Sequence, residues 1–130
     1  MTDIIHDRML GILGDTVIAL VRRRGRDLTV RQLGVFLICY FEAEAQTVRG
    51  LAAKLKVPKP TITRALDRLS EFNLVRRKVD PSDRRSVLVH STMQGNAFVR
   101  DIDGIMAHAD ALAEKRRSAP RHSSHVTGAN

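Results

Sequence analysis

Cationic side chains are the residues with the clearest potential for chemistry, and they gather in the middle of the chain. Between Arg49 and Ser91 the sequence holds eleven Lys/Arg and four Asp/Glu, so this third of the chain carries a net charge of +7 out of a total of +8. A concentrated positive charge favours a polyanionic partner such as nucleic acid. The chemistry predicted here is therefore recognition of phosphates and bases.

Two stretches contain most of these cations. Lys54–Leu69, with the sequence KLKVPKPTITRALDRL, places a proline turn ahead of a helical pattern with a polar outer face. The turn-like Asp80–Arg85, DPSDRR, follows a basic strand. Together the two stretches are typical of a helix that enters a DNA groove with a hairpin wing behind it.

The elements that must position these stretches are mainly helices, which apolar residues at steps of three and four predict. Thr29, Thr47 and Thr92 suit N-caps, because a hydroxyl can accept a hydrogen bond from a first-turn N–H group. Gly25 and Asn73 follow helices where a left-handed residue is expected. The predicted helices span about residues 3–24, 30–44, 48–55, 59–72 and 92–117.

Two β-prone runs, Leu74–Val79 and Ser86–Ser91, flank the turn chemistry of Asp80–Asp83. The expected fold class is therefore mainly α with a small antiparallel β-hairpin, a winged helix-turn-helix. The second helix holds three of the five aromatic residues and is predicted to be the core helix. Its inner stripe is expected to consist of Leu33, Phe36, Leu37, Tyr40 and Phe41.

Length and composition favour one domain in a reducing compartment. A chain of 130 residues fits a single core. No apolar run approaches the roughly 18 residues that a membrane span needs, and the N-terminus lacks the pattern of a signal peptide. We therefore expect a cytoplasmic protein that does not enter a membrane. Cys39 is the only cysteine, which excludes an intrachain disulfide.

The order helix, helix, helix-turn-helix, hairpin and long helix resembles the MarR family of winged-helix transcriptional regulators. Three pieces carry the resemblance. They are the LTVRQ opening of the second helix at Leu28–Gln32, the recognition unit Leu51–Leu69 that ends in DRL, and the DPSDRR wing closed by Thr92 and Gly95.

The resemblance implies one domain over residues 1–117. Dimerisation helices at about 3–24 and 92–117 would flank a winged helix-turn-helix at about 29–91, and residues 118–130 would form a disordered tail. It also implies a homodimeric repressor that binds double-stranded DNA at a pseudo-palindromic operator in a bacterial or archaeal cytoplasm. Relatives bind small effectors between the dimer helices and the winged domain, so relief by a small-molecule effector belongs to this interpretation.

The family's DNA-binding roles can be carried over by position. The start of the fourth helix would face bases and phosphates, and Arg68 would face the DNA backbone. Arg85 would enter the minor groove, with Asp83 orienting its guanidinium. The remaining wing cations would contact phosphates. The full set of implied DNA-binding residues is Lys59, Thr61, Thr63, Arg64, Arg68, Arg76, Arg77, Lys78, Arg84 and Arg85.

The chain departs from the family pattern in three places. Pro58 stands where relatives often have a capping Ser, so a side-chain bond to the start of the recognition helix is expected to be missing. Ser91 replaces a common Leu before the last helix. The C-terminal region is shorter than in many relatives, which bears on the extent of the dimer interface.

Cys39 and the histidines have structural as well as functional readings. Cys39 lies among apolar residues on the core helix, so core packing is favoured over a redox-responsive role. Asp83 can cap the wing turn, orient Arg85, or do both. Of the five histidines, only His122 and His125 have a ligand-like spacing, and we expect no metal site.

Other functional classes remain as alternatives to a sequence-specific regulator. The basic surface also fits a nonspecific architectural or RNA-binding protein, or a winged helix that binds a protein partner. An enzyme is not expected, because no nucleophile, base and orienting group occur at a recognisable spacing. No phosphate-cradling glycine loop and no cofactor motif are expected either.

Overall fold

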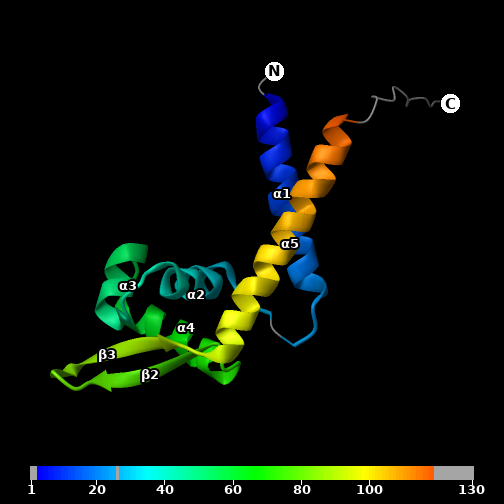
Figure 1. Ribbon diagram of the computed structural model, residues 1–130. Coiled ribbons are helices and arrows are strands. Elements are labelled where there is room, and N and C mark those ends of the chain that lie inside the picture. Colours follow the sequence, from blue (N-terminus) through cyan, green and yellow to red (C-terminus); the bar gives the residue numbers. More distant parts are fainter. Residues whose placement is uncertain (1–2, 26, 119–130) are drawn as a thin grey trace.

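The computed structural model describes residues 3–25 and 27–118, and it consists of a winged lobe from which a pair of long helices projects (Figure 1). The described elements are α1 (Asp3–Arg22), α2 (Val30–Phe41), β1 (Gln46–Thr47), α3 (Val48–Leu55), α4 (Lys59–Glu71), β2 (Val75–Asp80), β3 (Asp83–Ser91) and α5 (Met93–Ser118).

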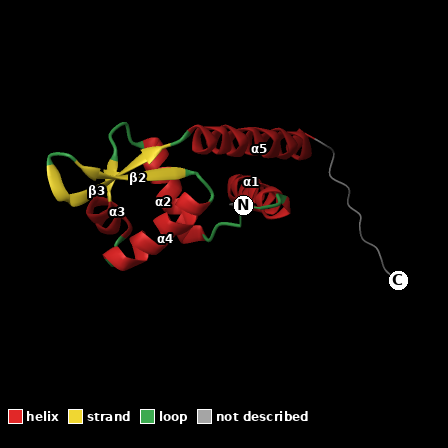
Figure 2. Ribbon diagram, turned by 90° about the horizontal axis from the view of Figure 1, so that it is seen from below, coloured by secondary structure: helices red, strands yellow, loops and turns green. Residues whose placement is uncertain are grey.

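The lobe packs α2, α3 and α4 against a small antiparallel sheet with the strand order β1-β3-β2 (Figure 2). The fold class predicted from the sequence is therefore confirmed. Each helix gives its apolar stripe to one shared core. The side chains in this core with no measurable exposure are Val35, Phe36, Leu51, Ile62, Leu66, Leu69 and Leu74.

The predicted caps are confirmed by their hydrogen bonds. Thr29 forms a capping box with Gln32, in which each side chain accepts from the other residue's backbone N–H. The Thr47 hydroxyl accepts from the Gly50 N–H at 2.9 Å. Asn73 has a φ of 59°, the left-handed conformation expected after α4. The threonine caps fix where α2 and α3 begin, and the left-handed Asn73 follows the end of α4.

Strand β1 was not predicted. Gln46 and Thr47 pair with Val89 and Leu88 across β3. Gln46 is buried, its amide nitrogen donates to the Glu44 carbonyl oxygen, and its amide oxygen accepts from Lys54 Nζ at 2.7 Å. A polar two-residue strand has no period-two pattern, so only the pairing with β3 reveals it.

Helix α2 ends earlier than predicted, and its inner stripe is partly wrong. Glu42 has an extended backbone with φ −89° and ψ 138°, so the helix stops at Phe41 rather than near residue 44. Phe41 is 74% exposed and does not belong to the core. Val35 takes its place as a fully buried residue. The helical phase places Val35 and Phe36, not Phe41, toward α4 and the sheet.

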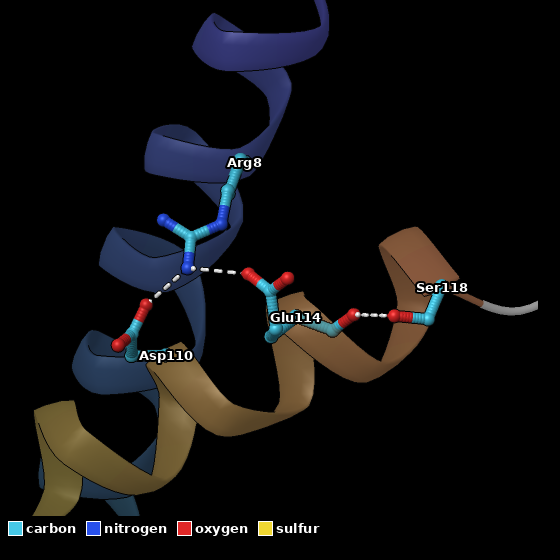
Figure 3. A network of polar contacts seen from close by, with 4 residues as sticks. All are labelled: Arg8, Asp110, Glu114 and Ser118. Carbon is cyan, nitrogen blue, oxygen red and sulfur yellow. Dashed lines mark hydrogen bonds and ion pairs between the residues drawn. The ribbon is translucent and has the colours of Figure 1, made fainter.

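The projecting helices α1 and α5 run antiparallel and are joined by ion pairs along their length. Arg8 on α1 reaches both Asp110 and Glu114 on α5 (Figure 3). Arg116 of α5 meets Asp15 of α1 at 3.0 Å. Such exposed pairs contribute about 0–1 kcal/mol each, so they fix the register of the helices more than they stabilise the fold.

The structure describes the C-terminal region as far as Ser118, and the predicted tail stays a prediction. Ser118, which was assigned to the tail, is the last residue of α5, and its hydroxyl donates to the Glu114 carbonyl oxygen at 3.0 Å. Residues 119–130 lie outside the described part of the chain. Within the described part, none of the helices is long and apolar enough to span a membrane.

Candidate nucleic-acid interface

Helix α4 is held so that one face is buried and the opposite face is free for contact. Ile62, Ala65, Leu66 and Leu69 pack inward, as the 3.6-residue period requires. The sharp turn from α3 is made by Lys56, whose φ of 58° is left-handed. The turn sets α4 across α3, which is the helix-turn-helix arrangement.

The start of α4 has no side-chain cap. Pro58 occupies the N-cap position, and no side-chain hydrogen bond closes the helix there, as the sequence predicted. Its carbonyl oxygen accepts from the Thr61 N–H at 3.0 Å. Pro58 and Pro60 carry no N–H, and the Thr61 N–H is bonded to Pro58. The first turn therefore leaves the Lys59 N–H and the positive end of the helix dipole available to an anion such as a DNA phosphate.

The predicted base-facing residues of α4 lie together on its outer surface. Lys59, Thr63 and Arg64 are exposed, and neither of the two cations forms an ion pair with another described residue. Thr61 is half-buried, so less of it is presented to a partner. The structure thus brings the cations and hydroxyls at the start of α4 onto one accessible face.

Arg68 lies farther along the same helix and is engaged within the protein. Its guanidinium pairs with Glu71 at 3.0 Å and lies 4.7 Å from the centroid of the Phe72 ring. About half of the side chain is exposed. The cation–π contact and the ion pair hold Arg68 along the helix, so it would have to leave both partners to reach a DNA backbone.

The wing is a β2–β3 hairpin with a turn built by two aspartates. Asp80 Oδ1 accepts from both the Ser82 N–H at 2.9 Å and the Ser82 hydroxyl at 2.8 Å. These two hydrogen bonds hold the pKa of Asp80 below its usual value, and the bond from the Ser82 backbone N–H has the larger effect. Asp83 Oδ1 accepts from the Arg85 backbone N–H at 3.1 Å. The carboxylates therefore shape the turn.

The arginines at the wing tip are free. Arg84 and Arg85 are exposed and form no ion pair with any residue that the structure describes. The bond that Asp83 makes is to the Arg85 backbone, which is the capping role; orientation of the Arg85 guanidinium by Asp83 stays a prediction. Both residues follow the turn between β2 and β3, and this hairpin extends outward from the lobe (Figure 1).

The three consecutive cations of β2 divide between the two faces of the wing, because side chains alternate along a strand. Arg77 shares the inner face with buried Val75 and pairs with Asp67 of α4 at 2.8 Å. Arg76 and Lys78 are exposed on the opposite face. The sequence had treated these cations as equivalent, and the structure separates Arg77 from the others.

A polar joint connects the winged lobe to α5, and sequence reasoning missed its central residue. Tyr40 Oη donates to the Leu74 carbonyl oxygen at 3.0 Å and accepts from the Thr92 N–H at 3.2 Å. The Thr92 hydroxyl donates to the Asn73 carbonyl oxygen at 2.6 Å and accepts from the Gly95 N–H at 2.9 Å. The spacing Thr92-x-x-Gly95 marked the cap but not its tyrosine partner.

Cys39 does not have the environment of an activated thiol. Burial raises its pKa from 9.0 to about 11, although the charge of Lys54 opposes this shift. Redox-sensing cysteines need a lowered pKa, because the thiolate is the reactive form. The packing reading is therefore favoured for Cys39. No cluster of three metal-ligating side chains occurs in the described residues, and His122 and His125 lie outside them.

A cavity of about 530 Å³ lies where α1, α2 and α5 meet the end of α4. Its wall is mainly apolar, and charged groups stand at its edge, including Arg23, which is paired with Asp101. The size is in the range of small-molecule sites. The lining residues include Val17, Leu20, Leu28, Leu33, Phe72 and Phe98.

Comparison with known proteins finds similarity to transcriptional regulators. The model of the MarR family matches residues 28–87. The HTH-type transcriptional regulator YsmB of Bacillus subtilis (strain 168) is 28% identical over 92 residues, which cover 66% of this chain and 62% of the relative. The matched segment thus spans less than two thirds of that relative's length.

Solved structures of regulators share the fold. A MarR transcriptional regulator from Methanosarcina mazei Go1 is 26% identical, with a TM-score of 0.57, and the match covers 72% of this chain and 66% of the other. The MepR–DNA complex of S. aureus is 20% identical, with a TM-score of 0.65, and the match covers 87% of each chain. The second likeness shows the fold alone.

Proposed function

Because the chain belongs to the MarR family of winged helix-turn-helix regulators, we propose that it is a dimeric regulator of transcription that binds specific double-stranded DNA. The observation that carries the proposal is the uncapped, cationic outer face of α4 beside a wing tip with two unpaired arginines. A nonspecific nucleic-acid binder would share the charge, and the test below separates the two.

In the proposed complex the first turns of α4 enter the major groove. A helix fits this groove, where Arg64 can bind a guanine edge with two hydrogen bonds and Thr63 can contact a base or its methyl group. The Lys59 ammonium and the Lys59 backbone N–H would bind phosphates, with Thr61 contributing less because it is half-buried. These contacts would set both sequence preference and register.

The wing would read the adjacent minor groove. Arg85 is the proposed inserted residue, because a narrow A·T-rich groove concentrates negative potential and attracts a guanidinium. Arg84 would bind the neighbouring phosphates. Arg76 and Lys78 belong to the same proposal as phosphate contacts, although their face of the wing is opposite to α4. Arg68 would contribute only after leaving Glu71.

A second copy of the chain is proposed to cover the apolar stripe of α1. Met9, Leu13, Val17 and Val21 follow one another at four-residue steps and are 46–69% exposed. An apolar stripe of this kind on a helix is expected to be buried by a partner. Two-fold pairing through α1 and α5 would present two α4 helices to half-sites about one DNA turn, ~10 base pairs, apart.

The proposal includes repression that a small molecule relieves. The cavity between α1, α2, α5 and the end of α4 would hold an apolar effector, and Phe72 at its wall directly follows α4. An occupant that changes how α1 and α5 meet the lobe would change the distance between the two α4 helices. That change would lower affinity for an operator of fixed spacing.

The experiment is a comparison of one interface arginine with one distant arginine. A duplex selected from a random pool by the wild-type protein serves as the operator. Arg64→Ala should weaken operator binding by about 1–3 kcal/mol and lower the preference over unrelated duplex. Arg117→Ala, at the far end of α5, removes the same charge and should change neither value by more than ~0.5 kcal/mol. Equal effects of the two substitutions would contradict the proposal.

A further inference from the structure

Arg77 is the wing cation that the structure ties to the recognition helix. Its Nη1 lies 2.8 Å from Asp67 Oδ1, and the Arg77 side chain is 31% exposed. Among the ion pairs of the described residues, this pair connects α4 with the hairpin. It therefore joins the two elements that the proposed function places in different DNA grooves.

The sheet register explains why Arg77 points at α4. Arg77 lies opposite Val89, which is buried, and shares its face with Val75, which is buried as well. Its aliphatic stem therefore lies at the edge of the core, with the guanidinium toward the helix. The next residue on this face, Val79, is 55% exposed. The ion pair thus stands at the outer limit of the packed part of the wing.

The helix side of the pair is equally specific. Asp67 follows Thr63 by four residues and Arg64 by three, so all three side chains share the outer face of α4. A carboxylate on a surface that meets phosphates is unfavourable unless a cation neutralises it. Arg77 supplies that cation from β2.

We propose that Asp67 and Arg77 are positioning residues that hold the wing at a fixed angle to α4. The proposal rests on the proposed function. Arg77 acts through Asp67 rather than by binding a phosphate, and α4 and the wing tip read DNA as one rigid unit. An unrestrained wing would still attract DNA through Arg84 and Arg85, but it would lose part of its ability to choose a sequence.

Double substitution separates this role from a direct phosphate contact. Binding of the selected duplex and of an unrelated duplex is measured over a range of salt for Asp67→Asn, Arg77→Gln and the double variant. Each single variant should lower the preference for the selected duplex about tenfold, and the double variant should lower it no further, because one interaction is lost in all three. The double variant removes one charge of each sign, so it should keep the wild-type salt dependence. Loss of one phosphate contact would instead lower the slope of log K against log salt by about 0.9.

A measurement without DNA tests the pair itself. Backbone order parameters of the wing amides Ser82–Arg85 should fall equally in Asp67→Asn and Arg77→Gln, and Arg76→Gln, on the opposite face of the strand, should leave them unchanged. The proposal would be overturned if the two single substitutions lowered the preference for the selected duplex additively in the double variant. It would also be overturned if the double variant had a lower slope of log K against log salt, or if the order parameters of the wing amides were unchanged in the single variants. If the wild-type protein shows no preference for any duplex, the proposed function fails, and the order parameters still decide whether the pair restrains the wing.

Discussion

Substitution of Gly95 by Ala is predicted to break the joint between the winged lobe and α5. A Cβ atom at this position would lie 1.6 Å from Tyr40 Oη, 2.6 Å from Tyr40 Cζ and 2.3 Å from the Leu74 carbonyl oxygen. No rotamer change of the new methyl group can relieve these overlaps. The tyrosine ring and the backbone at Leu74 must both move.

The size of the effect follows from what the movement breaks. Tyr40 Oη would lose its bonds to the Leu74 carbonyl oxygen and the Thr92 N–H, at about 0.5–1.5 kcal/mol each. The ring would also leave Phe36, whose centroid is 4.6 Å away. Overpacking of a closed site costs a further 1–3 kcal/mol or so. We therefore expect the free energy of unfolding to fall by about 4 kcal/mol.

The assay is urea unfolding at one fixed protein concentration, with another α5 glycine as the control. Gly104 has no atom within 4 Å of an added Cβ, so Gly104→Ala should stabilise the protein by up to about 1 kcal/mol through helix propensity. Tyr40→Phe combined with Gly95→Ala should recover less than half of the loss, because the contact with the Leu74 carbonyl oxygen remains. Wild-type stability of Gly95→Ala would refute the close packing of this joint.

Three further outcomes follow from the interface, the exposed stripe and the thiol. Arg85→Ala should weaken binding of the selected duplex by about 1–3 kcal/mol while leaving the thermal midpoint within about 2 °C, because the side chain is exposed and unpaired in the described structure; a large midpoint shift would show a structural role instead. Leu13→Glu on α1 should produce monomers in sedimentation experiments, and an unchanged mass would contradict a dimer interface on this stripe. Cys39 should react slowly with a disulfide reagent at pH 7. Because its folded pKa is about 11 against 9.0, the contribution of the thiol to stability should be constant below pH 9 and decline as the pH rises from 9 toward 11. Rapid reaction at pH 7, or no decline that Cys39→Ala abolishes, would contradict the buried environment of the thiol.

The sequence predicted the order and type of the main elements because their determinants are local. The hydroxyl caps of Thr29, Thr47 and Thr92 and the left-handed Asn73 each act within a few residues. The period of the apolar residues placed α4 within one residue of its observed end. Strand β1 could not be predicted, because its pairing with β3 stabilises it and its own two residues carry no strand pattern.

The candidate site could be predicted as a set of residues but not as an arrangement. Charge and spacing marked the cations of α4 and the wing, and the structure leaves Arg64 and Arg85 exposed. Whether a cation is available to bind DNA depends on its contacts within the protein, and the partners in these contacts lie either far away in the sequence or on a neighbouring helical turn. Arg77 is tied to Asp67, and Arg68 is tied to Glu71 and Phe72. Tyr40 joined no motif because its partners are 34 and 52 residues away.

Competition between duplexes tests the central claim most directly. The wild-type protein is bound to a labelled duplex that it selected from a random pool, and unlabelled duplex of unrelated sequence is added at physiological salt. Sequence-specific binding predicts that the complex survives about a thousandfold excess of competitor, since specific sites are typically bound at least ~10³ times more tightly than others. Loss of the complex at an equal amount of competitor would contradict sequence-specific recognition by α4 and the wing.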